Sequence, residues 1–120
     1  MSTSDCLFCK IVAGEIPSPK LYEDSDFIAI RDIRPQAQVH LLVIPKQHVA
    51  SLETAFPENG EAKEELIGSL FKVGTAVARQ NGLLPGGFRA VINTGRDGGQ
   101  TVFHLHLHIL GGKTLDDHFG

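Results

Sequence analysis

The run Phe103–Leu110 constrains this chain most strongly, because histidine alternates in it with apolar residues. Strict alternation is typical of a β-strand, in which successive side chains leave the backbone on opposite faces. The run therefore predicts a strand whose apolar residues enter a core. His104, His106 and His108 would line the opposite face, with neighbouring rings roughly 6.6–6.8 Å apart.

Three interpretations of this histidine row compete. It could be a polar strand face that happens to be rich in histidine, or a zinc site built from all three rings. A single ion held by all three needs a strong local bend, because His104 and His108 would lie roughly 13 Å apart along the strand. The third interpretation, a covalent nucleophile at His106 with flanking groups that handle protons, fits best. Crowded imidazoles lower one another's pKa, which would keep the nucleophile neutral near pH 7.

A glycine-containing loop, residues 95–101, leads directly into the histidine row. Its adjacent glycines, Gly98 and Gly99, let the backbone approach a ligand closely, and successive amides in such a turn can form a concavity that binds anions. A glycine turn between two strands is more often only a turn. Because this one precedes three histidines, we expect it to hold a phosphate, with side-chain donors from Gln100 and Thr101.

The segment His104–Leu110 matches the His-φ-His-φ-His-φ-φ signature, in which φ is apolar, of the histidine triad (HIT) nucleotide hydrolases and transferases. Asn93, Asp97–Gln100 and Gly111–Gly112 resemble the Hint branch of that family, the nucleoside phosphoramidases, and the likeness extends over most of the chain. The resemblance implies an α+β fold, with an antiparallel sheet of about five strands, one long helix and a short N-terminal helix.

The resemblance also implies how the chain is organised and assembled. A single HIT domain would span residues 1–120, with a flexible N-terminus over residues 1–5 and a C-terminal tail over residues 113–120. HIT proteins of this branch are typically homodimers, and we therefore expect the sheet to extend across a homodimer.

The resemblance gives roles to four histidines. His106 would attack the α-phosphorus of a purine nucleoside phosphoramidate and form a nucleotidyl-histidine intermediate that water then hydrolyses. His108 would donate a proton to the leaving amine or bond the phosphate. His40 matches a fourth active-site histidine, although its apolar strand alone would suggest a buried, hydrogen-bonded core histidine. This reaction requires no catalytic metal.

The resemblance also implies the residues that would contact the substrate. Asp32 would accept hydrogen bonds from the ribose hydroxyls. The phosphate region would be contacted by Asn93, Gly99, Gln100 and Thr101, although the Hint branch commonly has serine at the last position. An apolar slot for the base would consist of Phe8, Ile11, Ile16 and Ile30. From composition alone, those four would be core residues.

Two alternative functions stay open. Another branch of the family hydrolyses dinucleoside polyphosphates, and Gln100 could serve there as a group near the leaving phosphate. The chain could also be a zinc-containing nucleotide-binding module with weak catalysis. A nucleotide transferase fits less well, because transferases of this superfamily usually replace the last histidine of the row, and His108 is present.

The only cysteines form the motif Cys6-x-x-Cys9. This spacing fits a redox pair, half of a zinc site, or two unliganded buried thiols. A thioredoxin-like motif follows a strand, whereas only five residues precede Cys6. The resemblance to bacterial HIT proteins implies structural zinc, with His48 and His104 completing the ligands. Such a site would contribute stability and not chemistry.

The composition restricts the function classes further. The 120 residues suit one core, and the net charge of −3 with scattered basic residues argues against a surface that coats nucleic acid. No apolar run reaches the length of a membrane span, and the first residues are polar, unlike a signal peptide. We therefore expect a cytoplasmic protein that binds a small anionic ligand, with no nucleic-acid or membrane partner.

Periodicity and end signals predict the remaining elements. A short helix over residues 6–13 would have Asp5 as its N-cap and end at Gly14. The long helix, over residues 61–81, has an apolar stripe widened by Phe71. Strands are expected over residues 20–23, 26–32, 39–44 and 88–94, with the first two forming an antiparallel hairpin.

Overall fold

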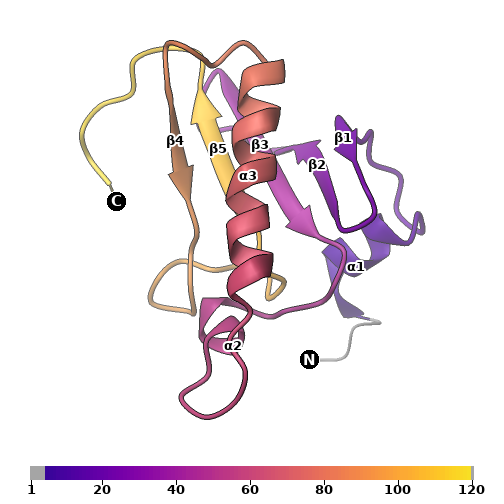
Figure 1. The fold of residues 1–120 in the computed structure, drawn as a ribbon. Coiled ribbons are helices and arrows are strands. Elements are labelled where there is room, and N and C mark those ends of the chain that lie inside the picture. The colour runs from indigo at the N-terminus through magenta and orange to yellow at the C-terminus, as the bar shows by residue number, and fades with distance from the viewer. Residues whose placement is uncertain (1–4, 120) are drawn as a thin grey trace.

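A computed structural model describes residues 5–119 of the chain. The fold is α+β, with one antiparallel sheet in the strand order β1-β2-β3-β5-β4 and helices on both of its faces (Figure 1). The elements are α1 (Leu7–Val12), β1 (Tyr22–Glu23), β2 (Phe27–Arg31), β3 (Val39–Pro45), α2 (Leu52–Ala55), α3 (Glu64–Gln80), β4 (Phe88–Val91) and β5 (Leu107–Gly111).

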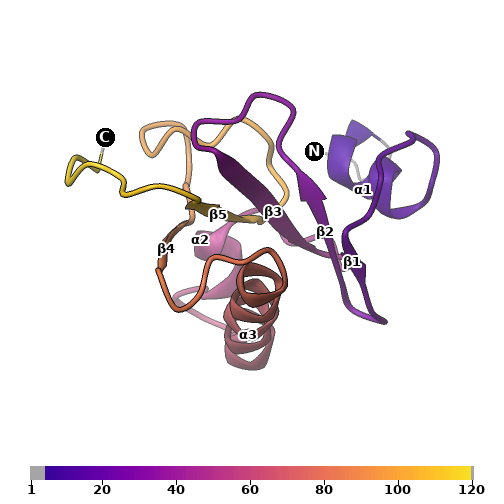
Figure 2. The same ribbon diagram turned by 90° about the horizontal axis from the view of Figure 1, so that it is seen from above.

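The sheet separates two apolar clusters. Seen from above, α3 lies on one side of the sheet and α1 on the other (Figure 2). In β2, Phe27 and Ala29 join the cluster on the α3 side, whereas Ile28 and Ile30 join the cluster on the α1 side. The alternation predicted for this strand is therefore confirmed, as is its antiparallel pairing with β1.

Helix α3 covers the sheet with a stripe of small and branched side chains. Leu70, Val73 and Val77 are buried, and Gly74 lets the helix approach β5 closely. The helix begins at Glu64, three residues later than predicted. Phe71 does not widen the stripe, because it is 43% exposed. One residue along a helix turns the side chain by about 100°, which carries Phe71 away from the sheet beside Leu70.

The short helix α1 begins with a cap that the sequence did not predict. Its N-cap is Cys6 and not Asp5, and the Cys6 Sγ accepts a hydrogen bond from the Cys9 amide at 3.2 Å. Gly14 ends the helix as expected, with a φ of 79°. The first cysteine therefore both starts the helix and directs its sulfur toward the interior.

The histidine row is a strand only in its second half. Strand β5 begins at Leu107, so the prediction of a strand from residue 103 is wrong for its first four residues. In the antiparallel register, Val43 pairs with Leu107, and Leu105 would therefore stand opposite Pro45. Because Pro45 has no N–H, the ladder cannot continue there. The amide of Leu105 bonds instead to the Val49 carbonyl, at 2.7 Å.

The remaining differences are at element ends. Strand β1 is shorter than predicted, β4 ends at Val91 because the chain turns into the glycine loop, and α2 was not predicted at all. Strand β4 is the last strand of the sheet in this chain. The extension of the sheet across a dimer stays a prediction, and the predicted flexible N-terminus, residues 1–5, lies outside the described residues except for Asp5. None of the helices in the described chain is long and apolar enough to cross a membrane.

Candidate active site and metal centre

A cavity of about 580 Å³ opens on the α1 side of the sheet. It is large enough for a nucleotide-sized ligand. Ten residues predicted from the sequence line it: Phe8, Ile11, Ile16, Ile30, Asp32, Asn93, Gly99, Thr101, His106 and His108. His40 lies behind His108, and Gln100 lies outside the lining. The apolar residues form one wall and the histidines with the glycine loop form the other.

The orientation of His106 leaves one ring nitrogen available to a ligand. Its Nδ1 lies 2.7 Å from the His104 carbonyl oxygen. Because a carbonyl only accepts, the hydrogen-bond network assigns the proton to Nδ1 and a lone pair to Nε2. Burial lowers the pKa of His106, and this outweighs the opposing influence of the His104 carbonyl and Asp32. The ring is therefore neutral near pH 7, as a nucleophile requires.

A chain of hydrogen bonds fixes the tautomer of His108. The Gln36 amide donates to His40 Nδ1 at 3.0 Å, so the proton of neutral His40 lies on Nε2. That Nε2 lies 2.9 Å from His108 Nδ1, which must accept. The remaining proton of His108 is therefore on Nε2, where it can be donated to a ligand. Asp32 Oδ2 lies 3.4 Å from His40 Nε2, farther away than the His108 Nδ1 acceptor.

His108 and His40 are also neutral near pH 7. Burial, together with crowding by His106 and His40, lowers the pKa of His108 to about 4. Burial also lowers the pKa of His40, despite the opposing charge of Asp32. The contact between His40 and Asp32 is therefore a long hydrogen bond between a neutral ring and a carboxylate near pH 7, and not an ion pair.

The glycine loop is already bonded to itself. The amides of Gly99 and Gln100 donate to the carbonyls of Arg96 and Gly95, each at 3.0 Å. Two of the three amides from Gly99 to Thr101 are therefore used within the loop in this structure. Among residues 5–119, only the Thr101 amide of the three has no acceptor.

Some side chains around the glycine loop hydrogen-bond to the protein, and others face the cavity. Asn93 Nδ2 donates to the Gly98 carbonyl at 2.8 Å, so Asn93 supports the loop while lining the cavity. Gln100 is 6% exposed and its carboxamide bonds only to protein groups, so it is not the side-chain donor that we expected. A Cβ at Gly98 would lie 2.4 Å from the Thr94 carbonyl oxygen, so only glycine fits there.

The apolar wall abuts the nucleophile. The Phe8 ring stands edge-on to the His106 ring, with 5.0 Å between their centroids. Phe8 and Ile11 come from α1 and Ile30 from β2, and all three belong to one buried cluster. Helix α1 therefore shapes the cavity from the side opposite to the glycine loop.

Asp32, in the loop that follows β2, also lines the cavity. Its Oδ1 accepts from the Arg34 amide at 2.8 Å, which fixes the loop after β2. Each carboxylate oxygen keeps a second lone pair, so hydroxyl groups of a ligand can still donate to Asp32. Leu7, Ile33 and Arg34 also line the cavity, and they were not predicted because they belong to no motif.

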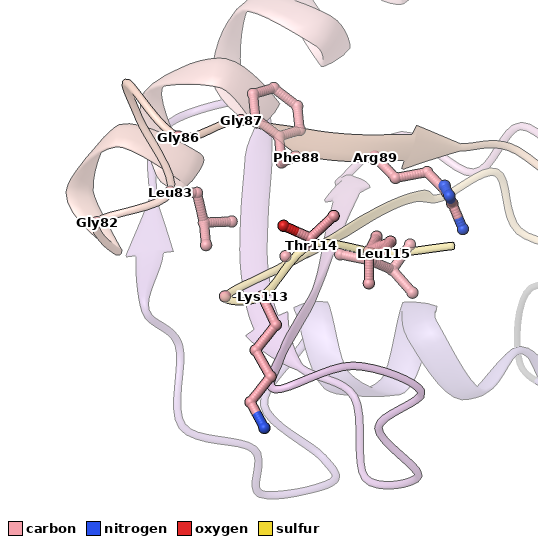
Figure 3. Close-up of a pocket in the computed structure, with 12 residues that line it drawn as sticks. Gly82, Leu83, Gly86, Gly87, Phe88, Arg89, Lys113, Thr114 and Leu115 are labelled. Atoms are coloured by element: carbon pink, nitrogen blue, oxygen red, sulfur yellow. The ribbon is translucent and has the colours of Figure 1, made fainter. Parts of the chain in front are cut away.

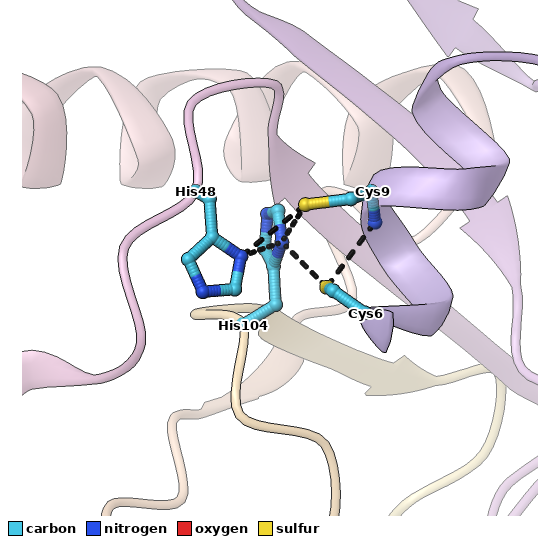
Figure 4. A group of neighbouring side chains, drawn as sticks. All are labelled: Cys6, Cys9, His48 and His104. Atoms are coloured by element: carbon cyan, nitrogen blue, oxygen red, sulfur yellow. Dashed lines mark hydrogen bonds between the residues drawn. The ribbon is translucent and has the colours of Figure 1, made fainter. Parts of the chain in front are cut away.

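The four residues expected to bind zinc lie together (Figure 4). The ligating atoms of Cys6, Cys9, His48 and His104 all lie within 4.8 Å of one another. His104 Nδ1 is 3.2 Å from Cys6 Sγ, 3.5 Å from Cys9 Sγ and 3.2 Å from His48 Nδ1. Tetrahedral zinc with two sulfur and two nitrogen ligands requires separations of roughly 3.3–3.8 Å. The donor set therefore fits a structural zinc ion closely.

The protonation of these groups suits a metal as well. His104 Nε2 lies 2.8 Å from the Pro45 carbonyl, so its proton is on Nε2 and the Nδ1 lone pair faces the cluster. Burial lowers the pKa of His104 to about 4, so no proton competes for Nδ1 near neutrality. Burial and the neighbouring Cys6 raise the pKa of Cys9 to about 11, which a bound cation would reverse.

A second cavity, of about 550 Å³, lies between the start of β4 and the chain that follows β5 (Figure 3). Arg89, Lys113 and Thr114 are among its lining side chains. None of the site residues expected from the sequence lines it. Arg89 also donates to the Asp116 carbonyl and lies 5.6 Å from the centre of the Phe119 ring, so the C-terminal tail rests against β4.

Comparisons with known proteins identify the family of this chain. The family model of the HIT domain matches residues 13–115. The purine nucleoside phosphoramidase of Escherichia coli K12 is 39% identical over 111 residues, which cover 92% of this chain and 90% of that protein.

Solved structures of similar proteins show the same fold. A histidine triad protein from Clostridium difficile is 43% identical with a TM-score of 0.89, and the match covers 99% of this chain and 100% of the other. A zinc-bound histidine triad family protein from Mycobacterium smegmatis is 39% identical with a TM-score of 0.78, covering 97% and 81%. The chain therefore belongs to the HIT family.

Proposed function

We propose that this protein hydrolyses the P–N bond of purine nucleoside phosphoramidates through a covalent nucleotidyl-His106 intermediate. The observation that carries the proposal is the tautomer of His106. Its Nδ1 proton is held by the His104 carbonyl, so a neutral Nε2 lone pair is left in a ring that lines a nucleotide-sized cavity. The similarity to a purine nucleoside phosphoramidase supports the choice of substrate.

The reaction would proceed in two displacements. His106 Nε2 attacks the α-phosphorus and the P–N bond to the amine breaks, while the Nε2–H of His108 donates a hydrogen bond to the phosphate and the amine takes up a proton from solvent water. Water then attacks the same phosphorus, the bond between phosphorus and His106 breaks, and the proton that this water loses returns to solvent. The products are a free amine and a nucleoside 5′-monophosphate.

The rest of the cavity would bind the substrate and stabilise the transition state. The base would lie in the slot that contains Phe8 and Ile11, and the ribose hydroxyls would donate to Asp32. The Thr101 amide and hydroxyl would bond to the nonbridging oxygens, where negative charge develops. An apolar slot discriminates weakly among bases, so the purine preference rests on the similarity to the named relative.

The test uses adenosine 5′-phosphoramidate with the wild type and with His106→Gly. The wild type should release adenosine monophosphate, and acid quenching during turnover should trap a protein whose mass is increased by one adenylyl group. The variant should bind adenosine monophosphate, form no adduct, and turn over at least about 10³-fold more slowly. Undiminished hydrolysis by a folded His106→Gly protein would rule out the mechanism.

The same assay distinguishes the alternative substrate class. Diadenosine polyphosphate should be cleaved with a much lower kcat/KM than the phosphoramidate. The feature that favoured dinucleoside polyphosphates was Gln100 as a contact for the leaving phosphate, and the carboxamide of Gln100 is fully bonded within the protein.

We propose that the metal at Cys6, Cys9, His48 and His104 is zinc and that it has a structural role. The two sulfur and two imidazole donors suit zinc, and a similar protein is zinc-bound. Metal analysis of the protein purified without added metal should find one zinc per chain, and Cys9→Ser should lose most of it. We also propose that the protein forms a homodimer, which light scattering tests. Its proposed location is the cytoplasm, which cell fractionation tests.

A further inference from the structure

Gln100 is a buried polar side chain whose hydrogen bonds are all internal. The Gly95 amide donates to Gln100 Oε1 at 2.9 Å. Gln100 Nε2 donates to the carbonyls of Ala50, at 2.7 Å, and Val102, at 3.0 Å. A primary carboxamide has one acceptor oxygen and two N–H donors, and all three groups are used here. The side chain therefore acts on the protein and not on a ligand.

The segment that follows Gln100 lacks a strand ladder. Residues 101–106 belong to no strand, because pairing with β3 ends at the pair of Val43 and Leu107, before Pro45. Two hydrogen bonds to residues 49–50 hold the chain at either end of residues 101–104. Gln100 Nε2 bonds the Ala50 carbonyl, and the Leu105 amide bonds the adjacent Val49 carbonyl. The Gln100 carboxamide thus supplies a hydrogen bond to residues 49–50 where this segment has no strand pairing.

The same side chain controls the direction of one backbone amide. Of the three amides from Gly99 to Thr101, only that of Thr101 has no acceptor in the described part of the chain. This N–H lies in the peptide plane between Gln100 and Thr101. The backbone N–H of Gln100 bonds the Gly95 carbonyl, and its side chain is fixed at three points, so this plane has little freedom to rotate.

We propose that Gln100 is a positioning residue that aims the Thr101 amide at the phosphate of the substrate. The proposal rests on the phosphoramidase function proposed above. Thr101 lines the cavity together with His106, so an amide held there is preorganised for the charge that develops during attack. Such a donor stabilises the transition state more than the bound substrate. Loosening Gln100 should therefore lower kcat with little change in KM.

The experiment compares Gln100→Ala and Gln100→Glu with the wild type. Alanine removes all three bonds, whereas glutamate keeps the shape but turns an oxygen toward the Ala50 and Val102 carbonyls. The matched control is Gln80→Glu, which makes the same substitution at an exposed position at the end of α3. The measurements are kcat and KM for adenosine 5′-phosphoramidate and the ¹H–¹⁵N shift of each loop amide with and without adenosine monophosphate.

We expect kcat to fall about 10- to 100-fold in both Gln100 variants, with KM and the affinity for adenosine monophosphate within about twofold of the wild type. In the wild type, adenosine monophosphate should shift the Thr101 amide more than those of Gly99 and Gln100. That response should be lost in the variants, and Gln80→Glu should behave as the wild type.

Three results would overturn the inference. The first is an unchanged kcat in folded Gln100→Ala. The second is a loss of kcat accompanied by shift changes throughout the sheet, which indicates a general structural role. The third is a wild-type Thr101 amide that does not respond to adenosine monophosphate, and this result needs no variant. If the wild type itself neither cleaves the phosphoramidate nor binds adenosine monophosphate, the proposed function fails before Gln100 is considered.

Discussion

At the scale of single residues, the chemistry of the site depends on where protons lie in three imidazoles. His106 is held by a carbonyl, whereas His108 is held by His40, which is itself oriented by a backbone amide. The histidine row and the resemblance predicted which rings take part. They could not predict the tautomers, because each partner comes from a distant part of the chain or from the backbone.

Replacement of His40 tests this relay. His40→Phe keeps a flat ring in a buried position but removes the donor to His108 Nδ1. His108 could then place its proton on either nitrogen, and we expect kcat for the phosphoramidate to fall about 10- to 100-fold with unchanged affinity for adenosine monophosphate. Phe88→Leu, on the other face of the sheet, serves as a control of comparable size. Full activity in His40→Phe would argue against the relay.

The lowered pKa of His108 also makes the stability of the fold depend on pH. In the unfolded chain His108 takes up a proton near pH 6.5, whereas in the folded protein it does so near pH 4. Between these values the unfolded state binds more protons, so the free energy of unfolding should fall as the pH decreases from 6.5 to 4 and stay level above 6.5. Burial of His40 and His106 acts in the same direction.

The measurement is urea denaturation at pH 5, 7 and 8, with the zinc content determined at each pH. His108→Gln should show a smaller loss between pH 7 and pH 5 than the wild type, because one buried titrating group is absent. An equal loss in both proteins would assign the pH dependence to other groups.

At the scale of elements, the contact between α3 and β5 depends on the missing side chain of Gly74. A Cβ there would lie 2.7 Å from Leu107 Cδ2 and 3.3 Å from Ile109 Cδ1. We expect Gly74→Ala to destabilise the protein by about 1–3 kcal/mol, because the added methyl group overpacks the core. Gly68 in the same helix has no atom within 4 Å of such a Cβ. Gly68→Ala should therefore stabilise the protein by about 0.5–1 kcal/mol.

Urea denaturation of both variants measures the difference between these two glycines. Destabilisation by Gly68→Ala, or no effect from Gly74→Ala, would contradict the packing described here.

Element types were largely predictable, and element ends were not. Alternation identified β2 and β5, and the 3.6-residue period identified α3, whereas a continuous apolar run identified β3, which is buried on both faces. The pairing of β5 with β3 ends early because Pro45 would stand opposite Leu105. The cap of α1 is the sulfur of Cys6, which also belongs to the cluster of two cysteines and two histidines. Short-range signals do not contain such contacts. The resemblance supplied most of the cavity residues, but it did not indicate the internal hydrogen bonds of Gln100 and of the glycine-loop amides.

At the scale of the whole molecule, the four residues that could hold a metal join segments that are distant in the sequence. Cys6 caps α1 and Cys9 lies on it, His48 follows β3, and His104 precedes β5. A metal bound only in the folded state stabilises it by about 2.7 kcal/mol when its free concentration is 100 times the Kd. For a chain of this size, removal of the metal should therefore lower Tm by roughly 10 °C.

Thermal unfolding with and without a strong chelator measures this effect, and added zinc should restore the original Tm. Cys9→Ser should have a lower Tm and respond little to the chelator. Because Phe8 lies between the two cysteines, the affinity for adenosine monophosphate should also weaken when zinc is removed. An unchanged Tm in the chelated protein, with zinc loss verified, would exclude a stabilising role.

The proline at the end of β3 has a consequence for the reaction itself. Had the ladder continued past Pro45, the backbone between residues 104 and 106 would have been drawn into cross-strand pairing. Because that nitrogen bears no hydrogen, the two chains part there, and the backbone of residues 104–106 leaves the strand conformation so that the His104 carbonyl oxygen lies 2.7 Å from His106 Nδ1. The orientation of the attacking nitrogen thus depends on a hydrogen that the tertiary amide of Pro45 lacks.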